Sequence, residues 1–409
     1  MKVVQQEKLK SFLLERARGC IHGPLGQLSW RFVTPSYGIE PGADDHTDKC
    51  NRTSIGHYLQ MYDWDACFFS QAARFLEDKD LPIEIVNNFL TVKTTDGHVP
   101  RTVSPGKFWD LGDHCKPFLC QALEHACKNF PDTKITEEML QSLKHFLDYF
   151  ETHRRHNSGL FHWRNVLESG VDNNLALIAP GPAAKEENIS HVDFPDGRLL
   201  AVDLNVYMTL EYRAFAFLCR RVGNTLLADK YTEKEFTQLE LIEQLLWNED
   251  KGHYSNRDPK FNTLVDTLSW TTLCPVMAGL SANARALSVI ENYMLSTDHF
   301  LGPKGLSSLS RSELLYNQSY RGLYGRAMVS NWQGPMWVLP NVMAVRGLLN
   351  YGLKDEAKEI ASLVVKTLVD ALDKTGTLTE NYDAETGKPL WAPQFISWNI
   401  LTLELLELL

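Results

Sequence analysis

Long and short connections alternate along this chain of 409 residues, and this rhythm limits the possible folds more than any single motif does. Apolar residues that recur at helical spacing, with Pro and Gly at the breaks, predict a chain whose regular secondary structure is almost entirely helical. The predicted helices cover residues 3–18, 55–76, 81–92, 115–129, 136–152, 201–221, 223–247, 264–278, 282–294, 334–350, 354–373 and 395–408. Evidence for strands is thin and is limited to short β-branched pieces such as Arg31–Thr34.

Every second predicted helix is preceded by a long loop. The long connections fall at residues 19–54, 93–114, 153–200, 248–263, 295–333 and 374–394, and the links between them have about six residues or fewer. Short links make antiparallel neighbours of the helices that they join. If the helices form one ring, all the long loops emerge on the same face. The pattern therefore predicts an all-α fold, a single (α/α)6 barrel of six helical hairpins that spans residues 1–409.

The bulk composition narrows the function classes. A formal net charge of −10 argues against nucleic acid and anionic membranes as partners, and no run of 18 apolar residues predicts a transmembrane helix. The N-terminus lacks the apolar core of a signal peptide, so we expect a cytoplasmic protein. The eight Cys include no CxxC pair, so we expect reduced thiols and no zinc ribbon. The sequence leaves a homodimer open.

Tryptophan is concentrated in the predicted loops and at the helix turns beside them. The loop residues are Trp30, Trp109, Trp163, Trp332 and Trp391, the bordering residues are Trp64, Trp247, Trp337 and Trp398, and Trp270 has the pattern of an ordinary helix residue. Aromatic faces beside polar groups suit sugar rings, which have apolar faces and hydroxyl rims. We therefore expect an aromatic pocket at the loop face.

The segment from Gly159 to Asn174 has no clean period and predicts a shaped loop rich in aromatic and charged residues. Gly170 allows a tight turn before Asp172, which makes Asp172 a candidate catalytic acid. An Asx turn or a helix N-cap explains the same spacing equally well. Glu168 has no assigned role and is taken as support.

A second acidic segment, residues 376–387, lies in the sixth long loop. Glu380 is the acid there with polar and aromatic neighbours, although a loop-stabilising carboxylate is the commoner alternative for such a residue taken alone. The third and sixth loops lie opposite each other on a ring of six hairpins. Two carboxylates on opposite sides of a pocket fit glycoside hydrolysis, and no metal or cofactor motif is found.

Three further segments are candidates for substrate binding. Tyr62–Asp65 offers an aromatic ring and acids at a helix start, where the helix dipole alone also favours acids. Asn331–Trp337 is a loop-to-helix junction that equally fits a packed helix start. Phe32–Gly38 is a candidate lid with Tyr37 directed at the site, and an ordinary surface loop explains it equally well.

Arginine also gathers in the long loops. The residues are Arg101, Arg164, Arg198, Arg311, Arg321 and Arg326. Arginine at the mouth of a pocket suits an anionic ligand, because the guanidinium fork pairs well with carboxylate. Loop-stabilising contacts explain each of them individually.

Five motifs taken together resemble the glycoside hydrolase family of processing α-glucosidase I. They are Tyr62-Asp-Trp-Asp65, Glu168-Ser-Gly-Val-Asp172-Asn173, Val202-Asp-Leu-Asn205, Trp332-Gln-Gly-Pro-Met-Trp337 and Thr379-Glu380, in the family's order. The short chain looks most similar to the family's mannosylglycerate hydrolase branch. The sequence departs from relatives at two places. Asn173-Asn174 stands where they often have Asn-Ser followed by Pro, and Gln333 stands where many of them carry Arg. Both departures leave the fine substrate preference open.

This resemblance implies an (α/α)6 barrel and an inverting hydrolase that splits an α-linked mannosyl- or glucosyl-glycerate into hexose and D-glycerate. Asp172 would be the general acid and Glu380 the general base. The implied hexose site holds Trp64, Asp65 and Trp332, and the implied glycerate site holds Tyr37, Arg198 and Gln394. The remaining binding candidates are Trp163, Gln333, Trp337 and Trp391.

Other interpretations remain. A sugar epimerase on the same barrel would need His acid/base pairs, for which His162 and the loop residues His98, His114, His191 and His253 are available. Another α-glucosidase or α-mannosidase acting on short oligosaccharides would use the same two acids. A carbohydrate-binding scaffold without catalysis is a third class.

Overall fold

Six helical segments, each of which follows a long connection, form a closed inner ring. They are α2 (Asp63–Gln71), α5 (Leu119–Asn129), α8 (Val202–Arg221), the 3₁₀ turn η4 (Trp270–Leu273) with α10 (Cys274–Met277), α12 (Val338–Asn350), and the 3₁₀ turn η6 (Ser397–Leu401) with α14 (Thr402–Leu408). Each segment packs on the next, and η6 packs back on α2. This computed structural model describes residues 3–38, 60–106, 112–178, 199–319 and 330–409. The predicted (α/α)6 barrel is confirmed.

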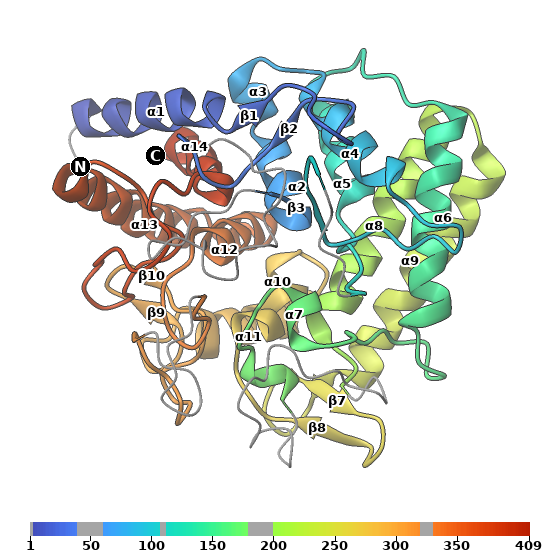
Figure 1. The fold of residues 1–409 in the computed structure, drawn as a ribbon. Helices are drawn as coiled ribbons and strands as arrows, with labels where there is room; N and C mark the ends of the chain where they lie inside the picture. Colours follow the sequence, from blue (N-terminus) through green and yellow to red (C-terminus); the bar gives the residue numbers. More distant parts are fainter. Residues whose placement is uncertain (1–2, 39–59, 107–111, 179–198, 320–329) are drawn as a thin grey trace.

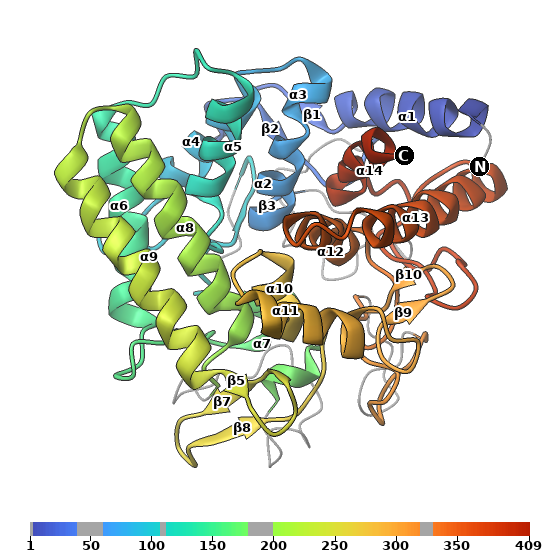
Figure 2. The same cartoon turned by 180° about the vertical axis from the view of Figure 1, so that it is seen from behind.

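The remaining long helices lie outside this ring. They are α1 (Val3–Arg18), α4 (Leu81–Thr91), α6 (Glu137–His153), α9 (Thr225–Leu245), α11 (Asn283–Val289) with the π turn η5 (Ile290–Met294), and α13 (Lys354–Thr375), with the short α3 (Ala73–Leu76) beside α2. Figures 1 and 2 show α8 paired with α9 on one side of the molecule and α12 paired with α13 on the other. Helix α1 packs on α13 and α14, so the N-terminal helix lies beside the C-terminal helices.

Local sequence signals explain where these helices begin and end. The Thr136 side chain caps α6 by accepting a hydrogen bond from the Met139 N–H at 3.1 Å. Helix α13 ends at Gly376, whose φ of 73° lies in the left-handed region that favours glycine. Its buried face repeats at spacings of three and four residues, with Ala357, Ile360 and Val364 all buried.

Strands are short and occur only as isolated antiparallel pairs within the described ranges. They are β1 (Ile21–His22), β2 (Phe32–Val33), β3 (Met61–Tyr62), β4 (Thr102–Val103), β5 (Trp247–Asn248), β6 (His253–Tyr254), β7 (Asn256–Asp258), β8 (Thr263–Val265), β9 (Leu301–Gly302) and β10 (Gly305–Leu306). These strands form five separate two-stranded sheets, which pair β1 with β2, β3 with β4, β5 with β6, β7 with β8 and β9 with β10. This agrees with the thin strand signal, including β2 within Arg31–Thr34.

The predicted helix over 264–278 is wrong in its first half. Thr263–Val265 forms strand β8, which pairs with β7, and helical structure begins only at Trp270. The β-branched and leucine run before Ser269 therefore follows strand pairing rather than helical periodicity. The predicted helix over 334–350 begins at Val338, because Gly334 has a φ of 152° that a helix does not contain.

The cysteines within the described ranges are all buried and form no disulfide, as predicted for reduced thiols; Cys50 lies outside these ranges. None of the described helices combines the length and the apolar character that a membrane crossing requires.

Candidate active site

The starts of the inner helices meet at one face of the ring. Asp65, in the first turn of α2, accepts a hydrogen bond from the hydroxyl of Ser397, at the start of η6, at 2.7 Å. Trp64 lies with its ring centroid 5.6 Å from that of Trp398. Since each inner helix is entered from a long loop, the loops emerge together at this face, as the connection lengths predict.

Five tryptophans form one cluster beneath the loops. The Trp332 ring stacks on Trp337 at 3.6 Å between centroids, and its centroid lies 5.7 Å from that of Trp270 and 5.8 Å from that of Trp64. Trp398 completes the cluster at 5.8 Å from Trp337. The expectation that Trp270 is an ordinary helix residue is wrong, because it stands at the start of an inner helix and stacks on a loop tryptophan.

These rings are packed against one another and are almost fully covered. Trp332 and Trp337 expose 1% and 0% of their surface, and Trp64 exposes 3%. Stacked, buried rings of this size stabilise the packed layer between the inner helices and the long loops. Trp247 takes no part in the cluster, because its ring packs on Tyr254 and under Arg285. Trp109 lies outside the described residues.

The loop that carries Asp172 contains a one-turn helix, α7 (Val166–Ser169), which the sequence pattern did not predict. The Asn165 side chain caps it by accepting a hydrogen bond from the Glu168 N–H at 2.6 Å. Gly170, with a φ of 79°, ends it and turns the chain towards Asp172. A second short turn, η1 (Leu175–Leu177), follows and is capped by the side chain of Asn174.

Gly170 fits closely against the start of the inner ring. A Cβ atom at this position would lie 2.6 Å from Cε of Lys116 and 2.8 Å from Cζ2 of Trp64. No side chain larger than hydrogen fits without movement of these buried neighbours. The backbone just before Asp172 is therefore held against Trp64 on α2.

Asn173 fixes the other side of the acid. Its Oδ1 accepts a hydrogen bond from the Trp332 N–H at 2.7 Å, and its Nδ2 donates to Oδ1 of Asn331 at 2.9 Å. The Gln333 side chain donates to the Asn173 carbonyl oxygen at 3.3 Å. Gln333, predicted to bind substrate, is 1% exposed and uses its amide to hold the acid loop.

Asp172 itself is the more accessible of the two predicted catalytic acids. Its side chain is 25% exposed, and its Oδ1 lies 4.0 Å from Nη2 of Arg101, a residue of the second long loop. Burial would lower the pKa of the Arg101 guanidinium, but the negative charges of Asp172 and Asp63 outweigh burial and raise that pKa. Arg101 thus carries a fixed positive charge beside Asp172.

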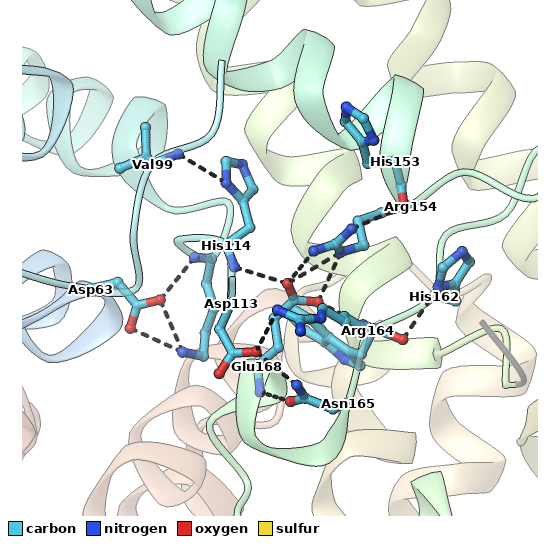
Figure 3. Close-up of polar contacts among 12 residues, drawn as sticks. Asp63, Val99, Asp113, His114, His153, Arg154, His162, Arg164, Asn165 and Glu168 are labelled. Carbon is cyan, nitrogen blue, oxygen red and sulfur yellow. Dashed lines mark hydrogen bonds and ion pairs between the residues drawn. The ribbon is translucent and has the colours of Figure 1, made fainter. Parts of the chain in front are cut away.

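Glu168 joins three segments beneath the acid loop, as Figure 3 shows. Its carboxylate, which is 0% exposed, accepts hydrogen bonds from Nε and Nη2 of Arg154, the latter at 2.7 Å. It also accepts from the backbone N–H groups of His114 at 2.9 Å and Arg164 at 2.6 Å. Burial raises the pKa of Glu168, but the Arg154 charge and these hydrogen bonds outweigh burial and lower it. Glu168 is therefore ionised, and it holds the acid loop to the segments that carry His114 and Arg154.

A second buried ion pair lies beside the first. Lys116 Nζ donates to both carboxylate oxygens of Asp63 at 2.9 and 3.0 Å, and both side chains are 0% exposed. The ammonium also lies 4.9 Å from the ring centre of Trp64 (Figure 3 shows the Asp63 carboxylate with its bonds). This pair binds the second long loop to the first turn of α2.

Glu380 lies on a hairpin formed by the sixth long loop. Its N–H donates to the carbonyl oxygen of Trp391 at 2.9 Å, and Thr379 pairs with Pro393 in an antiparallel bridge. Asn399, on η6, donates to the Thr379 carbonyl oxygen at 2.8 Å. Glu380 is 3% exposed, so its carboxylate is held in a covered position at the start of the inner ring.

One segment, residues 331–337, supports both acid loops. Trp332 binds Asn173, the neighbour of Asp172, while Met336 exchanges backbone hydrogen bonds of 2.7 and 2.9 Å with Tyr382, two residues after Glu380. The two predicted acids, which lie far apart in the sequence, are therefore attached to the same short piece of chain.

Two further carboxylates at the inner helix starts have perturbed acidity. Burial raises the pKa of Asp65 to about 7, against the lowering effect of its bond from Ser397. Burial likewise raises the pKa of Asp203, in the first turn of α8, to about 6. Asp203 accepts a hydrogen bond from Nε1 of Trp163 at 3.0 Å. Trp163 is 1% exposed, and this bond anchors the start of the acid loop to α8.

Tyr37 and Gln394, which the sequence resemblance assigns to the glycerate site, are neighbours in the structure. The Tyr37 N–H donates to the Gln394 carbonyl oxygen at 3.1 Å, and the Tyr37 hydroxyl lies 3.0 Å from Oγ1 of Thr377. The Tyr37 ring packs edge-on against Phe12 of α1. Gln394 has a φ of 65°, a strained left-handed conformation for a residue with a side chain. Arg198, the third residue of this group, lies outside the described residues.

Sequence reasoning missed the residues that support the acids. Lys116, Arg154 and Asn165 lie in or beside the predicted long loops, but their roles depend on contacts with residues 14 to 53 positions away. The capping spacing from Asn165 to Glu168 was a readable signal for α7. The Arg101–Asp172 approach had no signal beyond the gathering of arginine in the loops.

Comparisons with known proteins agree with this architecture. A family model described as "Mannosylglycerate hydrolase MGH1-like glycoside hydrolase domain" matches residues 58–398. A periplasmic trehalase of Escherichia coli O139:H28 is 26% identical over 372 residues, which cover 81% of this chain and 62% of the trehalase. The chain spans 30% to 63% of the length of these curated trehalases.

Two solved structures share the fold over nearly the whole chain. A GH63 mannosylglycerate hydrolase from Thermus thermophilus, in complex with glucose, has a TM-score of 0.69 at 16% identity and covers 98% of this chain and 99% of its own. The neutral trehalase Nth1 from Saccharomyces cerevisiae has a TM-score of 0.63 at 14% identity and covers 98% of this chain and 80% of its own. At these identities the likeness shows the fold alone.

Proposed function

Because this chain belongs to the mannosylglycerate hydrolase MGH1-like glycoside hydrolase family, we propose that it is an inverting hydrolase of a small α-linked glycosyl-glycerate. The products are the hexose, mannose or glucose, and D-glycerate. One observation carries the proposal: Asp172 and Glu380 are both anchored, through Asn173 and Tyr382, to the segment at residues 331–337.

In the proposed reaction Asp172 is the general acid. It donates a proton to the glycosidic oxygen as the bond from that oxygen to the anomeric carbon breaks, and D-glycerate leaves. Glu380 accepts a proton from the water that attacks the opposite face of the anomeric carbon, which inverts the configuration. The 25% exposure of Asp172 suits a group that must regain its proton from solvent, whereas the 3% exposure of Glu380 suits a base that holds one water.

The hexose is proposed to lie beside α2, where Asp65 offers a carboxylate next to Trp64. The backing of Asp65 by Ser397 at 2.7 Å and of Trp64 by the tryptophan cluster supports this assignment, because both side chains are rigidly held. The glycerate is proposed to lie near Tyr37, Gln394 and Arg198. The strained backbone of Gln394 supports a functional role for that turn, since such strain is concentrated at binding sites.

Hydrolysis of trehalose is the second candidate, favoured by the matches to trehalases that cover 81% of the chain. It uses the same two acids and differs in the leaving group, which is a neutral sugar rather than an anionic acid. The epimerase interpretation has less support. The His114 ring is buried among Phe146, Tyr149 and Phe150, and burial lowers its pKa well below the ordinary value.

A substrate panel tests the proposal. Mannosylglycerate, glucosylglycerate, trehalose and an aryl α-glucoside are each incubated with the enzyme, and released hexose is measured. We expect a glycosyl-glycerate to give the highest kcat/KM. Trehalose as the best substrate would replace the proposal by the second candidate, and tight calorimetric binding without turnover of any member would indicate a binding protein.

Matched variants test the two acids. Asp172→Ala and Glu380→Ala are each expected to lower kcat by about three orders of magnitude or more with the fold retained. Glu385→Ala is the control, since this acid lies on the same hairpin but is paired with Arg311 at 2.8 Å at the surface. Near-wild-type turnover in either catalytic variant refutes that assignment.

A further inference from the structure

The guanidinium of Arg101 faces the predicted general acid from a rigid backbone. The Arg101 N–H donates to the Asp113 carbonyl oxygen at 3.1 Å, and the Arg101 carbonyl oxygen accepts from the Asp63 N–H at 3.0 Å. These two hydrogen bonds fix the backbone of Arg101, which directly precedes β4. The side chain is 13% exposed, and its Nη2 lies 4.0 Å from Oδ1 of Asp172.

The other carboxylates near Arg101 are bound by different partners. Asp63 is held by Lys116 at 2.9 Å, and Oδ1 of Asp113 accepts a hydrogen bond from Asn165 at 2.7 Å. Within the part of the chain that the structure describes, Asp172 supplies the one carboxylate oxygen within 4.0 Å of the Arg101 guanidinium. The charge of Arg101 is therefore directed at Asp172.

We propose that Arg101 is a positioning residue that stabilises the carboxylate left on Asp172 when Asp172 gives its proton to the departing oxygen. This inference rests on the proposed role of Asp172 as general acid. In the step, the O–H bond of Asp172 breaks, the proton joins the glycosidic oxygen, and the carbon–oxygen bond breaks with its electron pair on that oxygen. The negative charge that remains on Asp172 then lies beside a fixed cation.

The contact acts on the form of Asp172 that remains after proton transfer. An opposite charge within about 4–6 Å stabilises an ionised carboxylate. The charged and titratable groups around Arg101 are Asp63, Asp65, Asp113, Lys116, Asp172 and Tyr62. Asp63 and Lys116 neutralise each other, so loss of the Arg101 charge removes a cation from beside Asp172 that this pair does not replace.

The test compares kcat as a function of pH for the wild type, Arg101→Gln and Arg101→Lys. Below the alkaline limb, where Asp172 carries its proton, we expect Arg101→Gln to lower kcat by about 10- to 100-fold with KM little changed. We also expect the variant's alkaline limb to move to higher pH. Arg101→Lys, which keeps the charge, is expected to restore most of the limb position. Arg346→Gln is the matched control, because Arg346 forms a half-buried pair with Glu404 at 2.8 Å, towards the end of α12. Thermal unfolding of each variant shows whether it is folded.

A substrate with a leaving group that needs no proton separates this inference from the proposed function. In an α-hexosyl fluoride the leaving group is the fluoride ion, which departs without a proton from a general acid. We expect Arg101→Gln and Asp172→Asn to retain turnover of the fluoride while losing turnover of the glycoside. If Asp172→Asn hydrolyses the glycoside normally, the proposed function fails.

Other outcomes overturn the role of Arg101 alone. If Asp172→Asn behaves as expected but Arg101→Gln keeps the wild-type alkaline limb, the charge of Arg101 does not act on the acid. A change confined to KM for glycosyl-glycerates, with trehalose unaffected, would instead make Arg101 a ligand of the substrate carboxylate. Equal loss on the fluoride and the glycoside would reduce Arg101 to a structural residue.

Discussion

Oδ1 of Asn173 accepts a hydrogen bond from the backbone N–H of Trp332 at 2.7 Å, across 159 positions of sequence. The bond joins the loop of the predicted acid Asp172 to the segment before α12. Nδ2 of the same Asn173 side chain donates a hydrogen bond to Oδ1 of Asn331 at 2.9 Å. One amide thus satisfies two buried partners and fixes the residue next to Asp172.

Asn173→Ala is expected to lower both stability and kcat. The substitution leaves the buried Trp332 N–H without this acceptor, at a cost of about 1–3 kcal/mol. It also removes one of the two hydrogen bonds to Oδ1 of Asn331, which keeps the bond from the Gln333 N–H at 3.0 Å. Urea unfolding and steady-state kinetics measure the two effects. Asn292→Ala is the control, because its side-chain bond to Ser288 is exposed. Full activity of Asn173→Ala would contradict the anchoring role of this amide.

Gly170 and Gly223 form a natural pair for a test of close packing. Their φ values are 79° and 84°, so alanine adds similar backbone strain at both, about 1–2 kcal/mol. A Cβ at Gly170 meets Lys116 at 2.6 Å and Trp64 at 2.8 Å, whereas a Cβ at Gly223 meets nothing within 4 Å. We expect Gly170→Ala to lower kcat at least tenfold and Gly223→Ala to leave kcat unchanged. Equal kinetics in the two variants would show that the loop tolerates movement.

Glu168→Gln is expected to destabilise the protein by about 3–5 kcal/mol, because it leaves the Arg154 guanidinium buried without its counter-charge. The pKa of Glu168 is lowered in the folded protein. Its ionised form therefore contributes stability above the ordinary pKa of glutamate, about 4.3, and this contribution is lost as pH falls towards the folded pKa. Denaturation at a series of acidic pH values is expected to show a shallower decline for the variant than for the wild type.

The control for Glu168 is Asp370→Asn, which removes an exposed ion pair with Lys366 whose side chains are 50% and 60% exposed. Such a pair contributes about 0–1 kcal/mol. If Glu168→Gln lowers the free energy of unfolding no more than Asp370→Asn does, the stabilising role of Glu168 is refuted.

Asp65→Asn is expected to stabilise the protein at alkaline pH while lowering activity. The pKa of Asp65 is raised to about 7 by burial, so the folded protein holds a proton there that the unfolded chain has lost. Stability therefore falls as pH rises from the unfolded pKa, about 4, to about 7. The asparagine variant lacks this fall and still accepts from Ser397. The gain in unfolding free energy relative to the wild type is expected to be about 2–3 kcal/mol larger at pH 8 than at pH 5. A gain that does not change with pH would contradict the raised pKa.

The ring was predictable because the length of a connection indicates whether the two helices that it joins are antiparallel neighbours. Long loops before Val202 and Val338 and short links after Arg221 and Asn350 require antiparallel pairs, and the structure has them. The segment at 264–278 failed because its first residues pair as strand β8 with β7, a contact that local periodicity does not record.

The floor of the site was only partly predictable. The concentration of tryptophan beside the loops indicated an aromatic site, but the 3.6 Å stacking of Trp332 on Trp337 shows rings that support the loops from below. The partners of Glu168 were beyond local patterns, because Arg154 and His114 approach it only once α6 and the second loop are packed.

The stereochemistry of the released sugar tests the central proposal most directly. Proton NMR during the first minutes of hydrolysis follows the hexose released from an α-linked glycosyl-glycerate before mutarotation mixes the anomers. Water activated by Glu380 on the face opposite Asp172 predicts that the β anomer forms first. Initial release of the α anomer would contradict the inverting mechanism and the roles given to both acids.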